Sequence, residues 1–148
     1  MRQNSFSIKR VLALTGLFLF PNLIPFSYVD NELKGYLKEF KDEIKGCSYA
    51  HANGGIQFVM VFQDKLETEL AYCQKSLTLR RIVIDKSFWD KLDYSGKYQI
   101  VMHELSHCYL NTKHMDKYPH YMNTYYDKQD FIKTKDELRK EIKEKCKL

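Results

Sequence analysis

Between Val29 and Lys45, apolar side chains recur every three or four residues, which is the spacing of one face of an amphipathic helix. The apolar positions are Leu33, Tyr36, Leu37, Phe40 and Ile44. Asp30 or Asn31 can cap the start of this helix, because a side-chain oxygen there accepts a hydrogen bond from the first backbone N–H groups. Gly46 can end it, because glycine readily adopts the left-handed conformation that closes many helices.

Shorter apolar segments follow, and they predict β-strands. Ile56–Gln63 is an apolar run after the turn sequence Asn53-Gly54-Gly55, and this combination favours a buried strand. Leu79–Asp85 is rich in β-branched residues and predicts a second strand. Leu70–Cys73 predicts a further short strand between them.

The second half of the chain has the pattern of helices. Ser87 is expected to cap a single helical turn. The apolar residues of that turn are Phe88, Trp89 and Leu92. The longer segment Ser95–Asn111 places four side chains on one helical face, because they are spaced three, four and three residues apart. These side chains are Ile100, His103, His107 and Leu110.

A last helix is predicted near the C-terminus. Thr134–Glu137 has the sequence of a capping box, in which the first and fourth residues satisfy each other's backbone groups at a helix start. Leu138, Ile142 and Cys146 then form one narrow apolar stripe among charged positions. Strands followed by helices, without a regular alternation, predict an α+β domain with a small mixed sheet and a C-terminal helix.

The N-terminus has the pattern of an export signal. Arg2, Lys9 and Arg10 precede the apolar stretch Val11–Phe20, which Pro21 ends. Ten residues are too few to span a bilayer, which needs about 20. We therefore expect residues 1–27 to be a signal peptide or an N-terminal anchor, and residues 28–148 to form one domain. A buried N-terminal helix is the structural alternative.

Net charge and cysteine content argue against some classes of function. Of 24 basic and 19 acidic residues, three basic and no acidic ones lie in residues 1–27, so the remaining chain is close to neutral. A nucleic-acid partner is therefore not expected. An exported chain can form disulfides, and its four cysteines allow three full pairings. The chain has no CxxC pair, which argues against a cysteine-based zinc ribbon.

The sequence His103-Glu104-Leu105-Ser106-His107 is an HExxH motif on the predicted central helix. Residues i and i+4 of a helix lie one turn apart on the same face, so both imidazoles can bind one zinc ion. Glu104 lies beside them, where it can serve as a general base without being a ligand. The structural alternative is an amphipathic helix with two buried, hydrogen-bonded histidines.

A catalytic zinc ion usually has three protein ligands, so a third is needed. His114 is one candidate, although a straight helix would carry it about 10 Å beyond His107. Asn111 can end the helix and reverse the chain, because asparagine tolerates the left-handed conformation. Glu137 is the rival third ligand. Asp116 is a candidate fourth ligand or hydrogen-bond partner of His114.

These residues resemble a zincin, and more narrowly a metzincin, whose motif is HExxHxxGxxH followed by a turn that bears a methionine beneath the metal. His103, Glu104 and His107 match that motif, whereas His114 lies one residue later than the third histidine of the family. Pro119–Asn123 resembles the Met-turn and contains Met122. An ordinary core methionine is the alternative for Met122.

A closer resemblance is to small, mostly uncharacterised bacterial and phage metallopeptidase-like proteins. They share an IVID strand, a tryptophan-containing segment, a helix of the form HELGHCxLxxxH and a methionine-asparagine turn. The counterparts here are Ile82–Asp85, Trp89, HELSHCYLNTKH and Met122-Asn123, within residues 70–125. The resemblance also implies a Cys73–Cys108 disulfide between a strand and the active-site helix. Tyr125 is a weaker candidate for a residue that contacts the metal or the transition state.

The resemblance implies a zincin-like sheet packed on the HExxH helix, with strand Leu79–Asp85 at the edge of the substrate cleft. It implies peptide-bond hydrolysis by a zinc-activated water, with Glu104 as general base. The expected partner is a peptide or protein substrate, and the expected location is periplasmic or secreted, with membrane anchoring through the N-terminus as an option. The alternative function is an exported zinc-containing binding module without catalytic activity.

Overall fold

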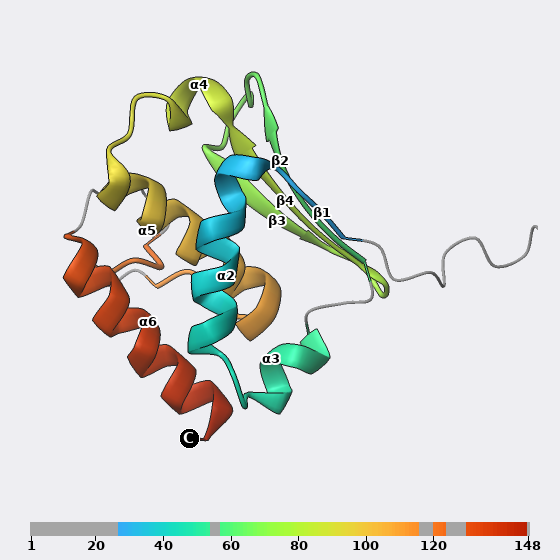
Figure 1. Cartoon of the computed structure of the whole chain (residues 1–148), viewed down its shortest axis with the longest axis vertical. Helices are drawn as coiled ribbons and strands as arrows, with labels where there is room; N and C mark the ends of the chain where they lie inside the picture. Colours follow the sequence, from blue (N-terminus) through green and yellow to red (C-terminus); the bar gives the residue numbers. More distant parts are fainter. Residues whose placement is uncertain (1–26, 54–56, 116–119, 124–129, 148) are drawn as a thin grey trace, which may run out of the picture.

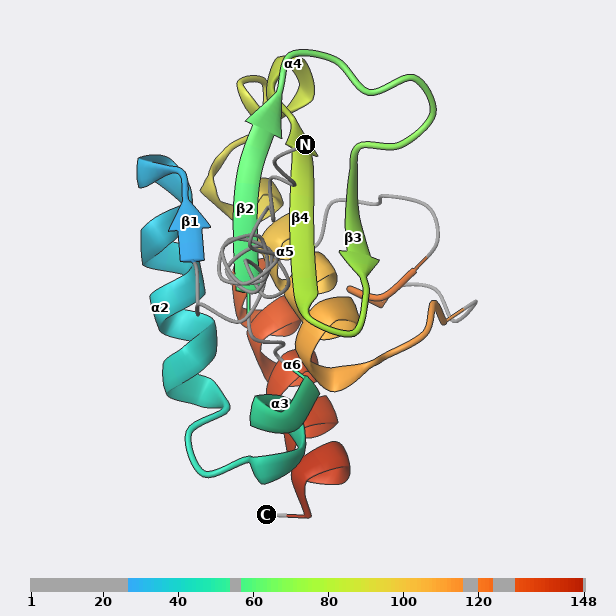
Figure 2. The same cartoon turned by 90° about the vertical axis from the view of Figure 1, so that its right-hand side faces the viewer.

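The fold was analysed in a computed structural model, which describes residues 27–53, 57–115, 120–123 and 130–147. Four strands form one mixed sheet: β1 (Ser27–Val29), β2 (Gln57–Gln63), β3 (Ala71–Lys75) and β4 (Leu79–Asp85). Figure 2 shows their order, β1-β2-β4-β3. The pairs β1–β2 and β2–β4 are parallel, and β3 runs antiparallel to β4.

Helices α2, α5 and α6 pack on one side of this sheet (Figures 1 and 2). The helical elements are a 3-10 turn η2 (Asn31–Leu33), α2 (Lys34–Glu43), α3 (Ser48–Asn53), α4 (Lys86–Trp89), α5 (Tyr94–Leu105), a π-helical segment η3 (Ser106–Leu110) and α6 (Phe131–Cys146). The fold is therefore α+β with a small sheet and a C-terminal helix, as the order of elements in the sequence predicts.

The core lies between the sheet and these helices. Its fully buried residues include Met60, Ile82 and Ile84 from the strands, Val101, Met102 and Leu105 from α5, Leu33 and Phe40 from η2 and α2, and Leu138 from α6. Strand β4 is central in the sheet, and its segment Ile82–Ile84 is inaccessible to solvent. This explains its continuous β-branched composition, because both of its faces are covered.

The side-chain cap predicted at the start of the first helix does not form. Asp30 precedes η2 but makes no side-chain cap there. Its carboxylate instead accepts hydrogen bonds from the Tyr28 hydroxyl and the Phe62 backbone N–H, at 3.1 and 2.9 Å. The tertiary contact with β2 therefore takes the oxygen that a cap would use. The end of the helix follows the sequence, since Gly46 has a φ of +90°, which glycine adopts without a steric penalty.

Two further helix starts also differ from the sequence prediction. Asp85, and not Ser87, caps α4 by accepting from the Phe88 N–H. Helix α6 begins at Phe131, three residues before the predicted capping box, because Asp130 accepts from the Ile132 N–H. Both caps are aspartates that lie directly before the first helical turn, where an ionised acceptor is most favourable.

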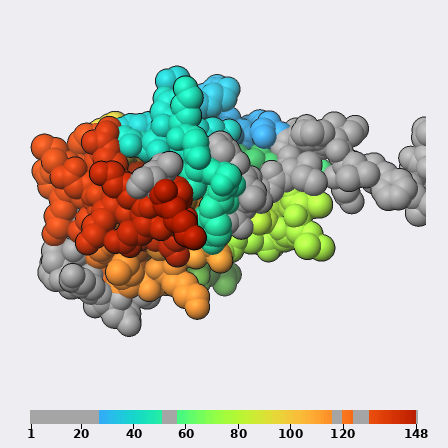
Figure 3. All heavy atoms as spheres, turned by 90° about the horizontal axis from the view of Figure 1, so that it is seen from below, coloured from blue at the N-terminus to red at the C-terminus, as the bar shows by residue number. Residues whose placement is uncertain are grey.

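Helix α6 is attached to the N-terminal half of the fold, beside α2 and α3 (Figure 3). Lys135 contacts the Glu39 carboxylate at 2.6 Å, and the Arg139 guanidinium donates to both oxygens of Glu43. A disulfide between Cys47 and Cys146 closes the far end of this contact. The predicted stripe Leu138, Ile142 and Cys146 is the face that α6 turns inward.

The two disulfides indicate a protein that matures in an oxidising environment. Across the described residues, every helix is too short or too polar to cross a bilayer. Residues 1–26 lie outside the described part of the chain, so the expected signal peptide or anchor stays a prediction.

Candidate metal centre

Helix α5 and the segment after it carry the first two histidines of the centre. Asp93 caps α5 by accepting from the Gly96 N–H, and the helix reaches Leu105 before it widens into the π-helical η3. His103 lies in the last turn of α5, and His107 is the second residue of η3. π-Helical segments are rare and often occur at functional sites.

The chain reverses at Asn111, as its sequence position predicts. Asn111 has φ 51° and ψ 33°, which is the left-handed conformation. The reversal brings His114 back beside the helix that it has just left. The His103 Nε2 atom is then 3.1 Å from His114 Nε2 and 3.0 Å from His107 Nε2.

The three imidazoles form one cluster in which each residue offers a ligand nitrogen, and these nitrogens lie within 4.8 Å of one another. His103 and His107 are half-buried, and His114 is exposed on the solvent side. Glu137, the rival third ligand, does not join the cluster. Its carboxylate accepts the Tyr121 backbone N–H at 2.9 Å instead.

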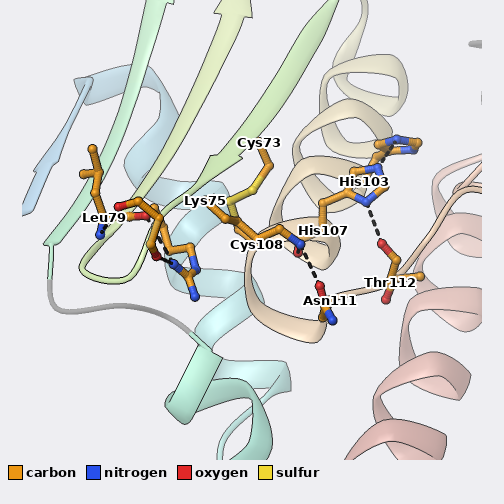
Figure 4. The surroundings of a disulfide bond; sticks show 10 residues. Cys73, Lys75, Leu79, His103, His107, Cys108, Asn111 and Thr112 are labelled. Atoms are coloured by element: carbon orange, nitrogen blue, oxygen red, sulfur yellow. Dashed lines mark hydrogen bonds between the residues drawn. A yellow bond between two sulfur atoms is a disulfide. The ribbon is translucent and has the colours of Figure 1, made fainter.

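Backbone carbonyls fix the orientation of two of these rings. His103 Nδ1 is 2.7 Å from the Tyr121 carbonyl oxygen, and His107 Nδ1 is 2.6 Å from the Thr112 carbonyl oxygen. The second of these contacts is drawn in Figure 4. A carbonyl can only accept, so each Nδ1 must carry the proton. In the neutral rings, both Nε2 atoms are therefore acceptors that point at each other.

The protonation of these rings favours a metal ion between them. Burial lowers the pKa of His103 to about 4, with smaller lowering contributions from the neighbouring histidines, and the contact with the Tyr121 carbonyl partly opposes this. Burial also lowers the pKa of His107. Both rings are thus neutral at pH 7, and their converging lone pairs repel each other unless a cation lies between them. The donor set therefore fits a divalent metal that accepts imidazole nitrogen.

Glu104 lies beside the cluster in a nearly water-free position. Its side chain is 6% exposed, and its Oε2 atom has no hydrogen-bond partner among the described residues. Burial raises the pKa of Glu104 to about 8, the charge of Glu69 adds to this, and a hydrogen bond from the Cys73 backbone N–H opposes it. The carboxyl group is therefore held where it can take up and release a proton near neutral pH.

A cleft of about 410 Å³ opens beside the histidines. One wall is the chain from Thr68 to Ala71, and the other includes Gln99 and Ile100 of α5. Glu104 also lines this cleft, and the loop residues Tyr121 and Asn123 complete it. The cleft is large enough for several atoms of a bound side chain or peptide.

The strand at this cleft is not the one expected from the resemblance. Leu79–Asp85 forms β4, which is flanked by β2 and β3 on its two edges, so it has no edge to offer a substrate. Strand β3 is the outer strand on that side, and its first residue Ala71 lines the cleft. The sequence missed this because β3 follows β2 along the chain but does not pair with it.

A clamp holds the end of the helix that carries the HExxH motif against β3 (Figure 4). Cys73 of β3 and Cys108 of η3 form a disulfide with a Cα–Cα distance of 5.8 Å. Two residues further along β3, the Lys75 ammonium donates to the His107 carbonyl oxygen and to Asn111 Oδ1, at 3.3 and 2.7 Å. Cys108 is therefore unavailable as a thiolate ligand.

Tyr121 is a residue that sequence reasoning missed. Its backbone carbonyl orients His103, its hydroxyl lies 3.1 Å from Ser106 Oγ, and its N–H donates to Glu137. Thr112 has a similar position, because its carbonyl orients His107 and its hydroxyl donates to Glu141. No sequence signal marks either residue, since the contact with the histidine is made by the backbone.

The remaining predicted residues have different outcomes. Met122 is fully buried in the core cluster, and its carbonyl accepts the Met115 N–H. The Met-turn assignment of Met122 stays a prediction. Asp116 and Tyr125 lie outside the described residues. His120 accepts the Met122 N–H at its Nδ1 atom and is not part of the histidine cluster.

Comparisons with models of protein families, with curated proteins and with solved structures find no match to this chain. The function proposed below therefore rests on the geometry of the site.

Proposed function

We propose that this protein is an exported zinc-dependent peptidase of zincin-like, and more narrowly metzincin-like, arrangement. The observation that carries the proposal is the convergence of three imidazoles, two of them oriented by backbone carbonyls, beside a carboxyl oxygen that has no hydrogen-bond partner among the described residues. Zinc is the metal best suited to three imidazoles with an open fourth position, and His103, His107 and His114 would hold it. The paired disulfides support maturation outside the cytosol.

The chain supplies the proton chemistry that hydrolysis needs. A zinc ion bound there is a Lewis acid, which makes a water molecule more acidic and a substrate carbonyl more electrophilic. Glu104 takes the proton from the attacking water and delivers it to the leaving amine. Its position in the cleft keeps both transfers away from bulk water. A positive charge beside Glu104 favours its carboxylate form, which is the form that a base requires.

A peptide is the substrate class that the cleft suits best. The wall formed by residues 68–71 leads into the outer strand β3, and an extended peptide can lie along such a wall. Main-chain contacts of this kind make few demands on the substrate sequence. Tyr121 and Glu104 also line the cleft, and both are buried in the fold.

Metal content is the first test. The full chain, purified with its disulfides intact, is dialysed and analysed for metals as wild type and as the variants His114→Ala and His120→Ala. We expect one zinc per wild-type chain, a large loss in His114→Ala, and full retention in the matched control His120→Ala. Absence of zinc from the wild type, or its retention in His114→Ala, would contradict the three-histidine centre.

Peptide hydrolysis is the second test. A mixed peptide library is incubated with zinc-loaded wild type and with Glu104→Gln, and the products are identified by mass spectrometry. We expect cleavage by the wild type only, together with unchanged zinc content in the variant, because Glu104 is not a ligand. Zinc binding without hydrolysis in the wild type would support the non-catalytic binding module instead.

A further inference from the structure

The cleft beside the histidines is acidic, although the chain as a whole is basic. The sequence carries a formal net charge of +5. Of the described residues that line the cleft, Glu69 and Glu104 are acidic, and none is lysine or arginine. Within the described lining, the formal charge therefore has the opposite sign to that of the chain as a whole.

The two carboxyl groups occupy different depths. Glu104 is almost completely buried, and one of its oxygens has no hydrogen-bond partner among the described residues. Glu69 is exposed and lines the same cleft just before β3. A ligand in the cleft can therefore reach the Glu69 carboxylate, whereas Glu104 is almost inaccessible to it. The charge of the Glu69 carboxylate thus favours a ligand that carries a cationic donor.

Apolar residues line the cleft together with Glu69. Leu70 and Ala71 follow Glu69 along the chain, and Ile100 of α5 also lines the cleft. A long basic side chain fits this combination, because its methylene stem packs on apolar surface while its charged end reaches a carboxylate. A peptide α-ammonium group shares the same charge and the same donors, so both sources satisfy the chemistry.

We propose that this cleft selects substrates that bear an ammonium or guanidinium group, and that Glu69 is the residue that determines this specificity. The proposal rests on the peptidase function proposed above, because it concerns the same cleft. Glu69 acts by binding the cation and not by proton transfer. Since Glu69 is exposed, its contribution is moderate, and we expect about threefold tighter binding of a cationic peptide at low salt.

The test compares peptides of one sequence that differ in a single charge. The reference peptide is acetylated, amidated and neutral, with a central glutamine. The second peptide has lysine at that position, the third has glutamic acid there, and the fourth is the neutral peptide with a free α-amino group. Dissociation constants are measured by NMR titration with the full, disulfide-intact, metal-free chain at low and high salt, so the readout does not depend on turnover.

The variants are Glu69→Gln and the matched control Glu67→Gln, which removes an exposed carboxylate two residues away that does not line the cleft. We expect wild type and Glu67→Gln to bind the lysine peptide or the free-amine peptide about threefold more tightly than the neutral one. Glu69→Gln should lose this preference, and Glu69→Lys should prefer the glutamic acid peptide. High salt should reduce the preference in the wild type.

Equal binding of all four peptides by the wild type, no binding of any of them, or an unchanged preference in Glu69→Gln would each overturn the proposal. The two cationic peptides separate the two sources of charge, a basic side chain and a free N-terminus. Hydrolysis of a library without charge preference would overturn this inference and leave the peptidase function standing. Charge-selective binding without any hydrolysis would overturn the peptidase function and leave the charge preference of the cleft standing.

Discussion

The two disulfides close chain segments of different length and lie in different parts of the molecule. Cys47 and Cys146 are 99 residues apart and join the start of α3 to the end of α6. Cys73 and Cys108 are 35 residues apart and join β3 to η3. Chain entropy depends only weakly on loop length, and it assigns about 5 and about 4 kcal/mol to the two bonds. By this measure, they stabilise the fold almost equally.

The two disulfides differ in their surroundings. Cys108 directly follows His107 of the histidine cluster, and Lys75 reinforces the same junction by hydrogen bonds to the His107 carbonyl and to Asn111. The Cys47–Cys146 bond instead closes a contact that charged pairs already hold, such as Arg139 with Glu43. We infer that the first disulfide orders the metal centre as well as the fold, whereas the second stabilises the fold alone.

The strongest way to break this comparison is to remove the disulfide beside the centre. In Cys73→Ser/Cys108→Ser, we expect a loss of about 4 kcal/mol in unfolding free energy. We also expect zinc affinity to fall about 10- to 100-fold, as it does when groups behind a metal ligand are lost. Thermal denaturation and competition with a chelator measure the two effects. Zinc affinity equal to that of the wild type would remove the distinction between the disulfides.

The matched change at the other disulfide should affect stability only. In Cys47→Ser/Cys146→Ser, we expect a loss of about 5 kcal/mol, because the open chain gains the entropy of a long loop. The zinc affinity of the folded fraction should stay at the wild-type value. Both are measured at low temperature, where the variant remains folded. Weaker zinc binding in this variant would mean that the α2–α6 contact also shapes the centre.

In the metal-free chain, the pH dependence of the unfolding free energy should come from the histidine centre and Glu104. The pKa of Glu104 is about 8 in the folded chain, far above its ordinary value of 4.5, so the folded state retains a proton that the unfolded state has lost. Stability should therefore fall by about 5 kcal/mol as pH rises from 4.5 to 8. The Glu104→Gln variant should not show this slope.

His103 has the opposite effect at lower pH. Its pKa is about 4 in the folded chain, below its ordinary value of 6.5, so it raises stability as pH rises between these limits. Between pH 6.5 and 8, the change in stability with pH therefore comes from Glu104 and not from His103. Chemical denaturation of wild type and Glu104→Gln across this window, with chelator present, makes the measurement. Parallel curves for the two chains would contradict the burial of an ionisable group at this position.

The smallest expected effect concerns the other half of the clamp. In Lys75→Met, loss of the ammonium that bonds the His107 carbonyl should cost about 1 kcal/mol of stability and a few-fold in zinc affinity. Lys38→Met is the control, because Lys38 forms an exposed pair with Asp42 that contributes little. Identical zinc affinity in both variants would leave the disulfide as the sole support of the junction.

Local periodicity predicted much of the fold. The strand Leu79–Asp85 has the bounds that the sequence indicates, and the helix that carries the HExxH motif lies where its apolar spacing places it. The caps were less predictable. Asp85 and Asp130 cap their helices in place of the expected residues, because which acceptor is free depends on distant contacts.

The sequence by itself determined the pair His103 and His107 and the neighbouring Glu104, because a helical period fixes which side chains share a face. It also indicated the reversal at Asn111, because few residues accept a left-handed backbone. Only the tertiary structure decided between His114 and Glu137, since Glu137 is engaged by the Tyr121 backbone.

The tertiary structure also decided what surrounds the histidines. It placed β3, and not β4, at the cleft, and it supplied the carbonyls of Thr112 and Tyr121 that orient the rings. It also paired Cys47 with Cys146 across most of the chain. These features depend on which segments meet in space, and that meeting is set by the packing of the whole core, which no local pattern encodes.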